Sequence, residues 1–178
     1  MPHPVTLVLR EKVLSWTGDD FGVKDTNGNV VVSCNAKMFS IRNKKTITDP
    51  NGQFLFGIQK KILRLLSTFV AVDANDNEIF RVKNKIAFGS KMHATFVNAS
   101  TGQPTTISLR GDIIGRSADL ILDNGQVVAQ IKRDILNATN FFTGQDTYYV
   151  VVAPGVDLSL ITAICICFDE VENDHHKR

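Results

Sequence analysis

Short runs of alternating apolar and polar residues fill most of the chain, and the pattern recurs about every 24 residues. Each unit has one alternating run, a turn rich in Asn, Asp or Gly, and a second alternating run. This is the pattern of a β-hairpin. The units cover residues 23–38, 47–62, 72–86, 97–113 and 122–135, and the unit at 97–113 has one extra residue in its turn. Five hairpins predict ten strands.

The turn sequences support this interpretation. Asn27-Gly28, Asn51-Gly52 and Asn124-Gly125 are typical of two-residue hairpin turns, because both turn positions need a positive φ that Asn and Gly tolerate. A further alternating run at 5–10 precedes the hairpins, and another at 147–152 follows them. The sequence therefore predicts twelve strands.

The apolar stretch near the C-terminus does not alternate. Pro154-Gly155 predicts a turn, Asp157 can serve as a helix N-cap, and the apolar run LSLITAICICF follows. We predict a helix over about 157–169 that is apolar on every side and therefore buried. A buried strand is the alternative, because the run contains several β-branched isoleucines.

A single architecture accommodates these elements. A barrel of more than eight strands leaves a lumen. A helix is about 10 Å across, and one of this length is about 17 Å long, which matches strands of five or six residues. We therefore predict a mainly β fold, a twelve-stranded antiparallel closed barrel around a buried hydrophobic C-terminal helix. Residues 1–170 would form one domain, and residues 171–178 a polar, disordered tail.

These residues resemble a known family. The ordered hairpin units, Gly155 to Asp157, the apolar run with Ala163 and the following Asp169-Glu170 look like the LURP-one-related proteins of the tubby C-terminal-like superfamily. Relatives in that superfamily are the tubby C-terminal domain and the phospholipid scramblases. The resemblance implies the same barrel with a central helix. It also implies a link to plant defence. Because tubby domains bind phosphoinositides, the resemblance suggests the same kind of ligand here. The calcium-binding and cysteine-rich segments of scramblases are not found here.

Composition and the chain ends narrow the class of protein. The 178 residues include 20 basic and 18 acidic ones, a formal net charge of +2, which disfavours a nucleic-acid partner. The N-terminus has no signal-peptide pattern, and the longest apolar run is about half the length of a transmembrane segment. We expect a monomeric cytoplasmic protein, with peripheral membrane association as a further option.

The sequence offers no metal or catalytic motif. The segments DTNGN at 25–29 and DANDNE at 73–78 start like calcium loops, but they lack the Gly and Glu of an EF-hand at the sixth and twelfth positions. Cys165 and Cys167 would point about 200° apart on a helix, so they are interpreted as buried free thiols. Alignment of the repeats places Cys34 in an apolar column with Ile58, Val82, Leu109 and Ile131. We expect no metal, no cofactor and no enzymatic activity.

The repeat also predicts a separation of charge. In such a barrel all hairpin turns lie at one end, here called the hairpin-turn end, and all links between hairpins lie at the other, the linking end. The hairpin-turn end would hold Asp25, Asp49, Asp73, Asp76 and Asp123. The linking end would hold most of the basic residues, opposed there only by Asp112, Asp119 and Asp134: Lys37, Arg42, Lys44, Lys45, Lys60, Lys61, Arg64, Lys83, Lys85, Lys91, Arg110, Arg116, Lys132 and Arg133.

A basic end of this kind favours contact with anionic lipid headgroups. The candidate anionic-lipid-binding residues are Lys60, Lys61, Lys83, Lys85, Arg110, Lys132 and Arg133. Among them Lys83, Arg110 and Lys132 share one outward-facing column of the aligned repeats. The leading hypothesis is a non-enzymatic module that binds phosphoinositide or a protein partner through this end. The alternatives are a defence-related scaffold protein without lipid binding, in which these charges only keep the strand ends soluble, and a scramblase-like lipid-active protein.

Overall fold

The computed structural model describes residues 2–10, 21–35, 44–63, 66–84, 92–112, 117–132 and 147–176 of the chain. The strands in these ranges are β1 (Val5–Arg10), β2 (Phe21–Asp25), β3 (Val30–Asn35), β4 (Lys44–Thr48), β5 (Phe54–Leu63), β6 (Leu66–Val72), β7 (Glu78–Asn84), β8 (Met92–Val97), β9 (Pro104–Asp112), β10 (Ser117–Leu122), β11 (Val127–Lys132) and β12 (Thr147–Val152). One helix, α1 (Leu158–His176), follows the last strand.

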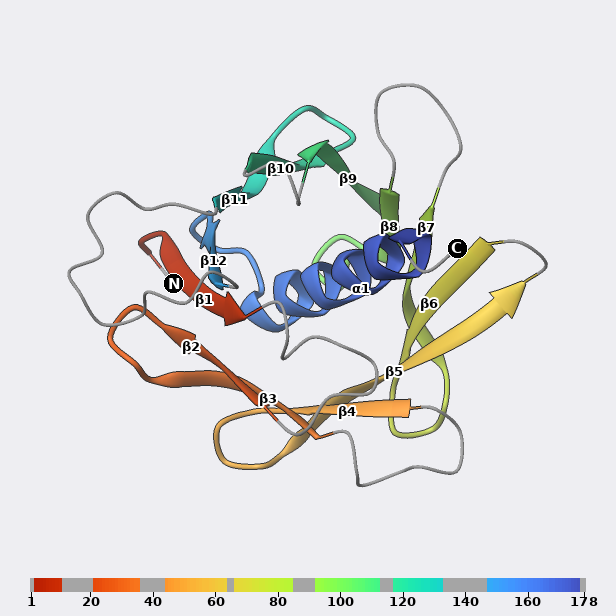
Figure 1. Cartoon of the computed structure of the whole chain (residues 1–178), viewed down its shortest axis with the longest axis horizontal. Coiled ribbons are helices and arrows are strands. Elements are labelled where there is room, and N and C mark those ends of the chain that lie inside the picture. Colours follow the sequence, from red (N-terminus) through yellow and green to blue (C-terminus); the bar gives the residue numbers. More distant parts are fainter. Residues whose placement is uncertain are drawn as a thin grey trace.

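The strands form one closed barrel in which each strand pairs with its neighbours in sequence. The first strand closes the sheet, because β1 pairs with β2 on one side and with β12 on the other, from Val5–Val152 to Arg10–Thr147. The pairings are antiparallel throughout. Figure 1 shows the strands as a ring around α1. The prediction of a twelve-stranded antiparallel closed barrel is confirmed.

The turns lie where the sequence predicts them, but most are longer than two residues. In the β2–β3 turn, the Asp25 amide donates to the oxygen of Asn29 at 2.9 Å, and the Gly28 amide donates to the oxygen of Asp25 at 3.1 Å. Gly28 has a φ of 84°, whereas Asn27 is not among the described residues with positive φ. The prediction of two-residue turns was therefore wrong, and the loop is a three-residue turn with its glycine in the left-handed position. The Asp25 carboxylate favours this longer turn by accepting the amides of Asn27 and Asn29.

The same turn recurs around the hairpin-turn end. Equivalent backbone hydrogen bonds close the β4–β5, β6–β7 and β10–β11 hairpins. Asp76 takes the left-handed position in the β6–β7 turn, with a φ of 63°. A β-bulge follows each of these four turns, and it leaves Val31, Leu55, Ile79 and Val128 without a residue opposite. Bulges bend a strand and turn its side chains to a new direction.

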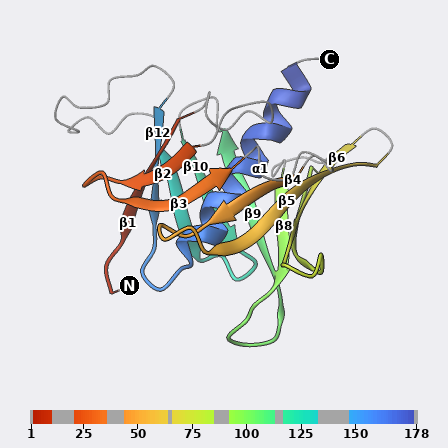
Figure 2. The same ribbon diagram turned by 90° about the horizontal axis from the view of Figure 1, so that it is seen from below.

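The helix fills the barrel. It begins after the Pro154-Gly155 turn, and the Asp157 Oδ1 caps it by accepting the amides of Ser159 at 2.8 Å and Leu160 at 3.1 Å. Every residue from Ile161 to Phe168 is at most 1% exposed. A helix buried on all sides must be enclosed, and Figure 2 shows α1 entering at the hairpin-turn end and leaving at the linking end. The prediction of a buried C-terminal helix is confirmed, and the strand alternative is wrong.

The helix is longer than the sequence pattern indicated. We expected it to end at about residue 169 and to be followed by a disordered tail over 171–178, but it continues to His176. The segment after Phe168 contains no Pro or Gly. Extending an existing helix adds one hydrogen bond for each residue fixed, so a polar sequence can continue a helix that the apolar segment has started. Within the described residues, no helix has both the length and the apolar character needed to cross a membrane.

The core confirms the aligned apolar column. Its members are at most 2% exposed and belong to one core cluster with the helix: Cys34, Ile58, Val82, Leu109 and Ile131. Cys165 and Cys167 are also buried as free thiols, as expected. The barrel wall and α1 therefore share a single hydrophobic core.

Candidate anion-binding surface

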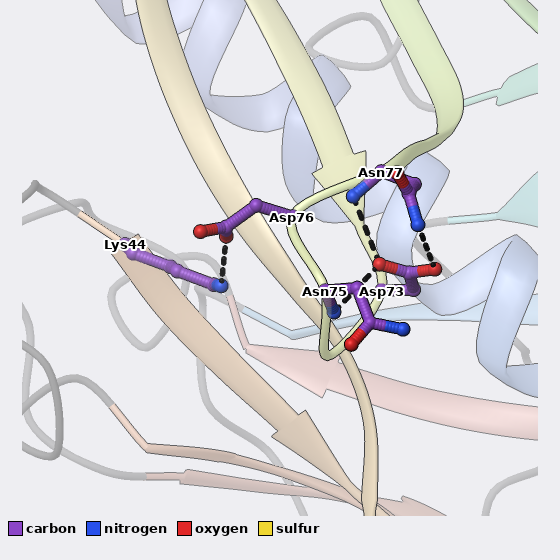
Figure 3. Close-up of polar contacts among 5 residues, drawn as sticks. All are labelled: Lys44, Asp73, Asn75, Asp76 and Asn77. Atoms are coloured by element: carbon purple, nitrogen blue, oxygen red, sulfur yellow. Dashed lines mark hydrogen bonds and ion pairs between the residues drawn. The ribbon is translucent and has the colours of Figure 1, made fainter.

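The predicted acidic residues lie at the hairpin-turn end: Asp25, Asp49, Asp73, Asp76 and Asp123. Asp73 shows how these carboxylates hold their turns. Its Oδ1 accepts the backbone amides of Asn75 and Asn77, both at 2.8 Å, and its Oδ2 accepts the side-chain amide of Asn77 at 3.0 Å (Figure 3). The side-chain hydrogen bond from Asn77 is the main cause that lowers the pKa of Asp73. Asn29 lowers the pKa of Asp25 in the same way, so both carboxylates are charged at neutral pH.

Four of the seven candidate basic residues are exposed on strands that lead to the linking end. Lys61 is on β5, Lys83 on β7, Arg110 on β9 and Lys132 on β11. Each lies within the last three residues of its strand. Lys85 and Arg133 fall outside the described residues, as do five other members of the predicted basic end, Lys37, Arg42, Arg64, Lys91 and Arg116.

Two lysines of the predicted basic end face the inside of the barrel. Lys60 precedes Lys61 on β5, so its side chain points to the opposite face of the sheet. Its Nζ lies 5.8 Å from the centroid of the ring of Phe69, which is a fully buried core residue. This distance suits a cation–π contact. Lys45 is 3% exposed and lies opposite the core residue Ile58. The structure therefore separates Lys60 and Lys45 from the outer surface that carries Lys61.

Lys61 and Lys83 come together on the outer surface. Lys61 lies opposite Thr68 on β6, and Thr68 lies opposite Lys83 on β7, so the three residues form one line across three strands. We call these three residues the lysine row. Adjacent strands are about 4.8 Å apart, so the two lysine backbones are about 10 Å apart. Thr68 between them is only 4% exposed, whereas both lysines are exposed.

One ion pair lies near the lysine row. Arg81 Nε donates to Glu78 Oε1 at 2.7 Å, and Arg81 Nη2 also donates to Glu78 Oε2. The hydrogen bonds from Arg81 lower the pKa of Glu78 most, and the charges of Lys61 and Lys83 lower it further. Within the part of the chain that the structure describes, neither lysine forms an ion pair with a carboxylate. Because Arg81 offsets Glu78, the lysine row keeps the positive charge of both lysines.

Arg110 and Lys132 do not join the lysine row. Beyond Lys83, the same line across the sheet passes through His93 on β8 and Ser108 on β9. Ser108 is two residues away from Arg110 along β9. His93 Nδ1 and Ser108 Oγ are 2.8 Å apart and share a hydrogen bond. Barrel strands are staggered, so equivalent positions of successive hairpins shift along the barrel axis. The aligned column of Lys83, Arg110 and Lys132 therefore becomes a staggered series of exposed charges rather than one patch.

Comparison with known proteins assigns the family. The family model described as LURP-one-related matches residues 5–169, nearly the whole chain. The chain belongs to the LURP-one-related family. This confirms the resemblance found in the hairpin units and the terminal apolar run.

Several relatives come from Arabidopsis thaliana. The chain is 20% identical to Protein LURP-one-related 15 over 97% of this chain and 82% of that relative. It is 26% identical to Protein LURP-one-related 12, covering 94% of this chain and 78% of the relative. It is 19% identical to Protein LURP1, covering 96% and 86%. An X-ray structure of an A. thaliana protein is similar to this LURP-one-related fold with a TM-score of 0.64, 19% identity and coverage of 96% of this chain and 93% of that one.

One predicted member of the basic end pairs with the opposite end of this LURP-one-related barrel. Lys44 Nζ lies 2.9 Å from Oδ1 of Asp76 in the β6–β7 turn (Figure 3). Its side chain crosses Gly57 on β5, where an added Cβ would lie 2.0 Å from Lys44 Cε. The assignment of Lys44 to the basic linking end was therefore wrong. The missing side chain at Gly57 lets the lysine reach across a strand.

Sequence reasoning missed the groups that accompany the two lysines. Thr68 and the Glu78–Arg81 pair became visible only with the strand register. Counting outward from the β6–β7 turn at residues 73–77 would have placed Thr68 opposite Val82, and only the bulge at Ile79 shifts the register so that Lys83 becomes its partner. Among the described residues, no group of three or more His, Cys, Asp or Glu side chains is arranged to hold a metal ion.

Proposed function

We propose that this LURP-one-related protein is a non-enzymatic module that binds the anionic headgroup of a membrane phosphoinositide through the lysine row. The observation that carries the proposal is the alignment of Lys61 and Lys83 across Thr68. Both lysines are exposed, and neither has a carboxylate partner within the described residues. In this proposal the protein is cytoplasmic and associates peripherally with the membrane.

The electrostatics of the row suit a ligand with more than one phosphate. Two positive charges about 10 Å apart on a hydrated surface repel each other by about 0.4 kcal/mol. A polyphosphate headgroup placed between them removes this repulsion and interacts with both ammonium groups. Each Lys near an anionic membrane surface contributes about 1 kcal/mol, so the row would supply about 2 kcal/mol. Affinity of this size makes membrane binding reversible and sensitive to salt.

Two more cations of the linking end suit the same orientation, whereas α1 leaves the barrel there with its acidic segment 169–174. Arg110 and Lys132 are exposed on strands that run to this end, so they would face the same membrane as the lysine row. The carboxylates of the hairpin turns lie at the opposite end and would point away from the anionic surface. The barrel would therefore meet the membrane end-on, and the row would give the closest contacts.

Vesicle flotation tests the proposal. Vesicles of phosphatidylcholine, with and without a small fraction of phosphatidylinositol 4,5-bisphosphate, are mixed with the wild-type protein and with the double variant Lys61→Glu, Lys83→Glu. We expect the wild type to float only with the phosphoinositide vesicles and the double variant to stay in the soluble fraction. Raising the salt concentration should release the wild type.

A matched variant separates site-specific binding from net charge. Lys24 is exposed on β2 just before the β2–β3 turn, so Lys24→Glu reverses a lysine at the opposite end. A second control, Arg110→Glu with Lys132→Glu, reverses two charges outside the row. We expect Lys24→Glu to bind like the wild type and the second control to lose less than the row variant. Equal losses in all three would show nonspecific attraction. Wild-type protein that never floats would reject the lipid proposal and leave the scaffold alternative.

A further inference from the structure

A cavity of about 420 Å³ opens at the hairpin-turn end of the barrel, beside the start of α1. Its apolar lining comes from six strands, β5 and β7–β11, and includes Phe56, Phe80, Phe96, Ile107 and Val128. Phe56 and Phe80 pack edge to face with ring centroids 5.8 Å apart. The aromatic wall is therefore fixed by the core, and the volume lies in the range of ligand-binding pockets.

The apolar lining continues onto the outer rim of the cavity. Val97 at the end of β8 is 62% exposed, and Ile79 at the start of β7 is 39% exposed. Both residues line the cavity. The bulge that follows the β6–β7 turn leaves Ile79 without a residue opposite. Large apolar side chains exposed together beside a cavity are typical of an interaction site.

The mouth of the cavity is acidic. Asp157 lines it, and Asp123 and Asp73 lie in the neighbouring β10–β11 and β6–β7 turns. Within the described residues none of these three aspartates forms an ion pair. The nearby Asp76 and Glu78 are already paired with Lys44 and Arg81. The charge of Lys44 also acts on Asp73, so Asp123 and Asp157 carry most of the negative charge around the mouth.

The start of the helix does not reverse this preference. A free helix N-terminus attracts anions through its unpaired amides. Here the Asp157 carboxylate already accepts the amides of Ser159 and Leu160 and also the Ser159 hydroxyl at 2.6 Å. The carboxylate thus compensates the helix dipole, and an anionic ligand would meet its negative charge. The site suits a ligand that combines an apolar group with positive charge.

We propose that this cavity binds a basic segment of a partner protein, with an apolar side chain in the cavity and Lys or Arg residues beside the carboxylates. A protein segment fits better than a small cationic molecule, because Val97 and Ile79 extend the apolar surface beyond the cavity and the aspartates come from separate turns. This site lies at the opposite end from the lysine row, where Figure 2 shows the start of α1. The protein can therefore hold a membrane and a basic partner at the same time.

Peptide titration tests the proposal. The probe is a short fluorescent peptide that alternates Lys with Leu, compared with one in which Glu replaces Lys and one in which Ser replaces Leu. Binding is followed by fluorescence anisotropy, and amide chemical shifts locate the site. We expect only the Lys–Leu peptide to bind, with shifts centred on residues 97–100 and 155–160. Shifts centred elsewhere, or equal binding of the Ser peptide, would overturn the proposal.

Two variants and a matched control locate the binding energy. Val97→Ser removes exposed apolar surface, and Ala99→Trp fills the cavity from the β8–β9 turn; both residues line it and are exposed, so the barrel should stay folded. Val30→Ser makes the same change at a 36% exposed valine on β3 that does not line the cavity. We expect affinity to fall at least about fivefold in the first two variants and to stay at the wild-type value in the third. Equal affinities in all three would refute the proposal.

The two proposals fail separately. The variant with Lys61→Glu and Lys83→Glu should bind the peptide as the wild type does, and Val97→Ser should leave vesicle flotation unchanged. A long-chain alkylammonium probe supplies the remaining comparison. If it competes with the peptide and binds at least as tightly as the peptide does, the site is one for small cationic amphiphiles and the protein-segment proposal is rejected.

Discussion

Replacing isoleucines of α1 tests whether the barrel encloses the helix on every side. Ile161, Ile164 and Ile166 are each fully buried. Successive helical residues are rotated by about 100°. The side chain of Ile161 therefore points about 60° from that of Ile164 and about 140° from that of Ile166, and the last two point about 160° apart. The substitutions Ile161→Ala, Ile164→Ala and Ile166→Ala therefore make the same chemical change against three different parts of the barrel wall.

Each substitution should lower the free energy of unfolding by about 3 kcal/mol, because buried Ile to Ala changes cost about 2–5 kcal/mol and an enclosed helix has little room to move into the cavity. For a chain of this size that loss lowers the melting temperature by about 6–12 °C. Urea unfolding followed by far-UV circular dichroism measures it. Leu158→Ala at the half-buried start of the helix is the control, with an expected loss below about 1.5 kcal/mol.

The pattern across the three positions carries the test. Similar losses at all three support enclosure. A loss of about 3 kcal/mol at one position with less than about 1 kcal/mol at another would mean that the helix rests against one wall, and the interpretation of α1 as the filling of the lumen would be wrong.

Three further predictions concern the backbone, the helix cap and acid stability. Gly111 has a φ of 112°, and an added Cβ would lie 2.6 Å from a backbone oxygen of β10. Gly111→Ala should therefore lower the free energy of unfolding, measured with urea, by more than about 2 kcal/mol. In the control Gly22→Ala the added Cβ would have its nearest contact at 3.5 Å, and the free energy should stay within about 1 kcal/mol of the wild type. Asp157→Ala should lower the free energy of unfolding by about 1 kcal/mol, whereas Asp157→Asn should restore most of it, and equal losses would mean that charge rather than capping matters. The lowered pKa of Asp73 gives stability that is present above the ordinary carboxyl pKa and is lost as the pH falls through the folded-state pKa. Asp73→Asn removes this carboxyl group, so the free energy of unfolding measured with urea should fall less steeply below about pH 4 than in the wild type. An unchanged pH profile would contradict this reasoning.

Local sequence signals predicted the hairpins well because each strand pairs with its neighbour in sequence. The turn residues set the strand limits, and the runs at 5–10 and 147–152 match β1 and β12. Turn type was not predicted, because Asn-Gly fits both a two-residue turn and the longer turn that Asp25 stabilises with its carboxylate. The helix end was missed because hydrophobicity ends at Phe168, whereas the backbone hydrogen bonds continue to His176.

The candidate sites depended on relations that a repeat alignment does not contain. Aligning the repeats grouped Lys83 with Arg110, but barrel stagger places Lys83 in line with Lys61 and Ser108. Lys44 was misplaced because its side chain crosses a strand over Gly57. The cavity joins residues of six strands and α1, and no local pattern marks such a combination.

The pairing of β1 with β12 has a consequence for how the protein is made. Val5 and Val152 are partners, so the first strand to leave the ribosome must wait for the last strand before the sheet can close. The hairpins between them involve contacts close in sequence and can form during synthesis, whereas ring closure has a high contact order and is slow. Until then β1 and β11 each have an unpaired edge, and the lumen still lacks α1. A ribosome that stops shortly before β12 would therefore release an open and unfilled sheet, which is the species most exposed to aggregation and to chaperones.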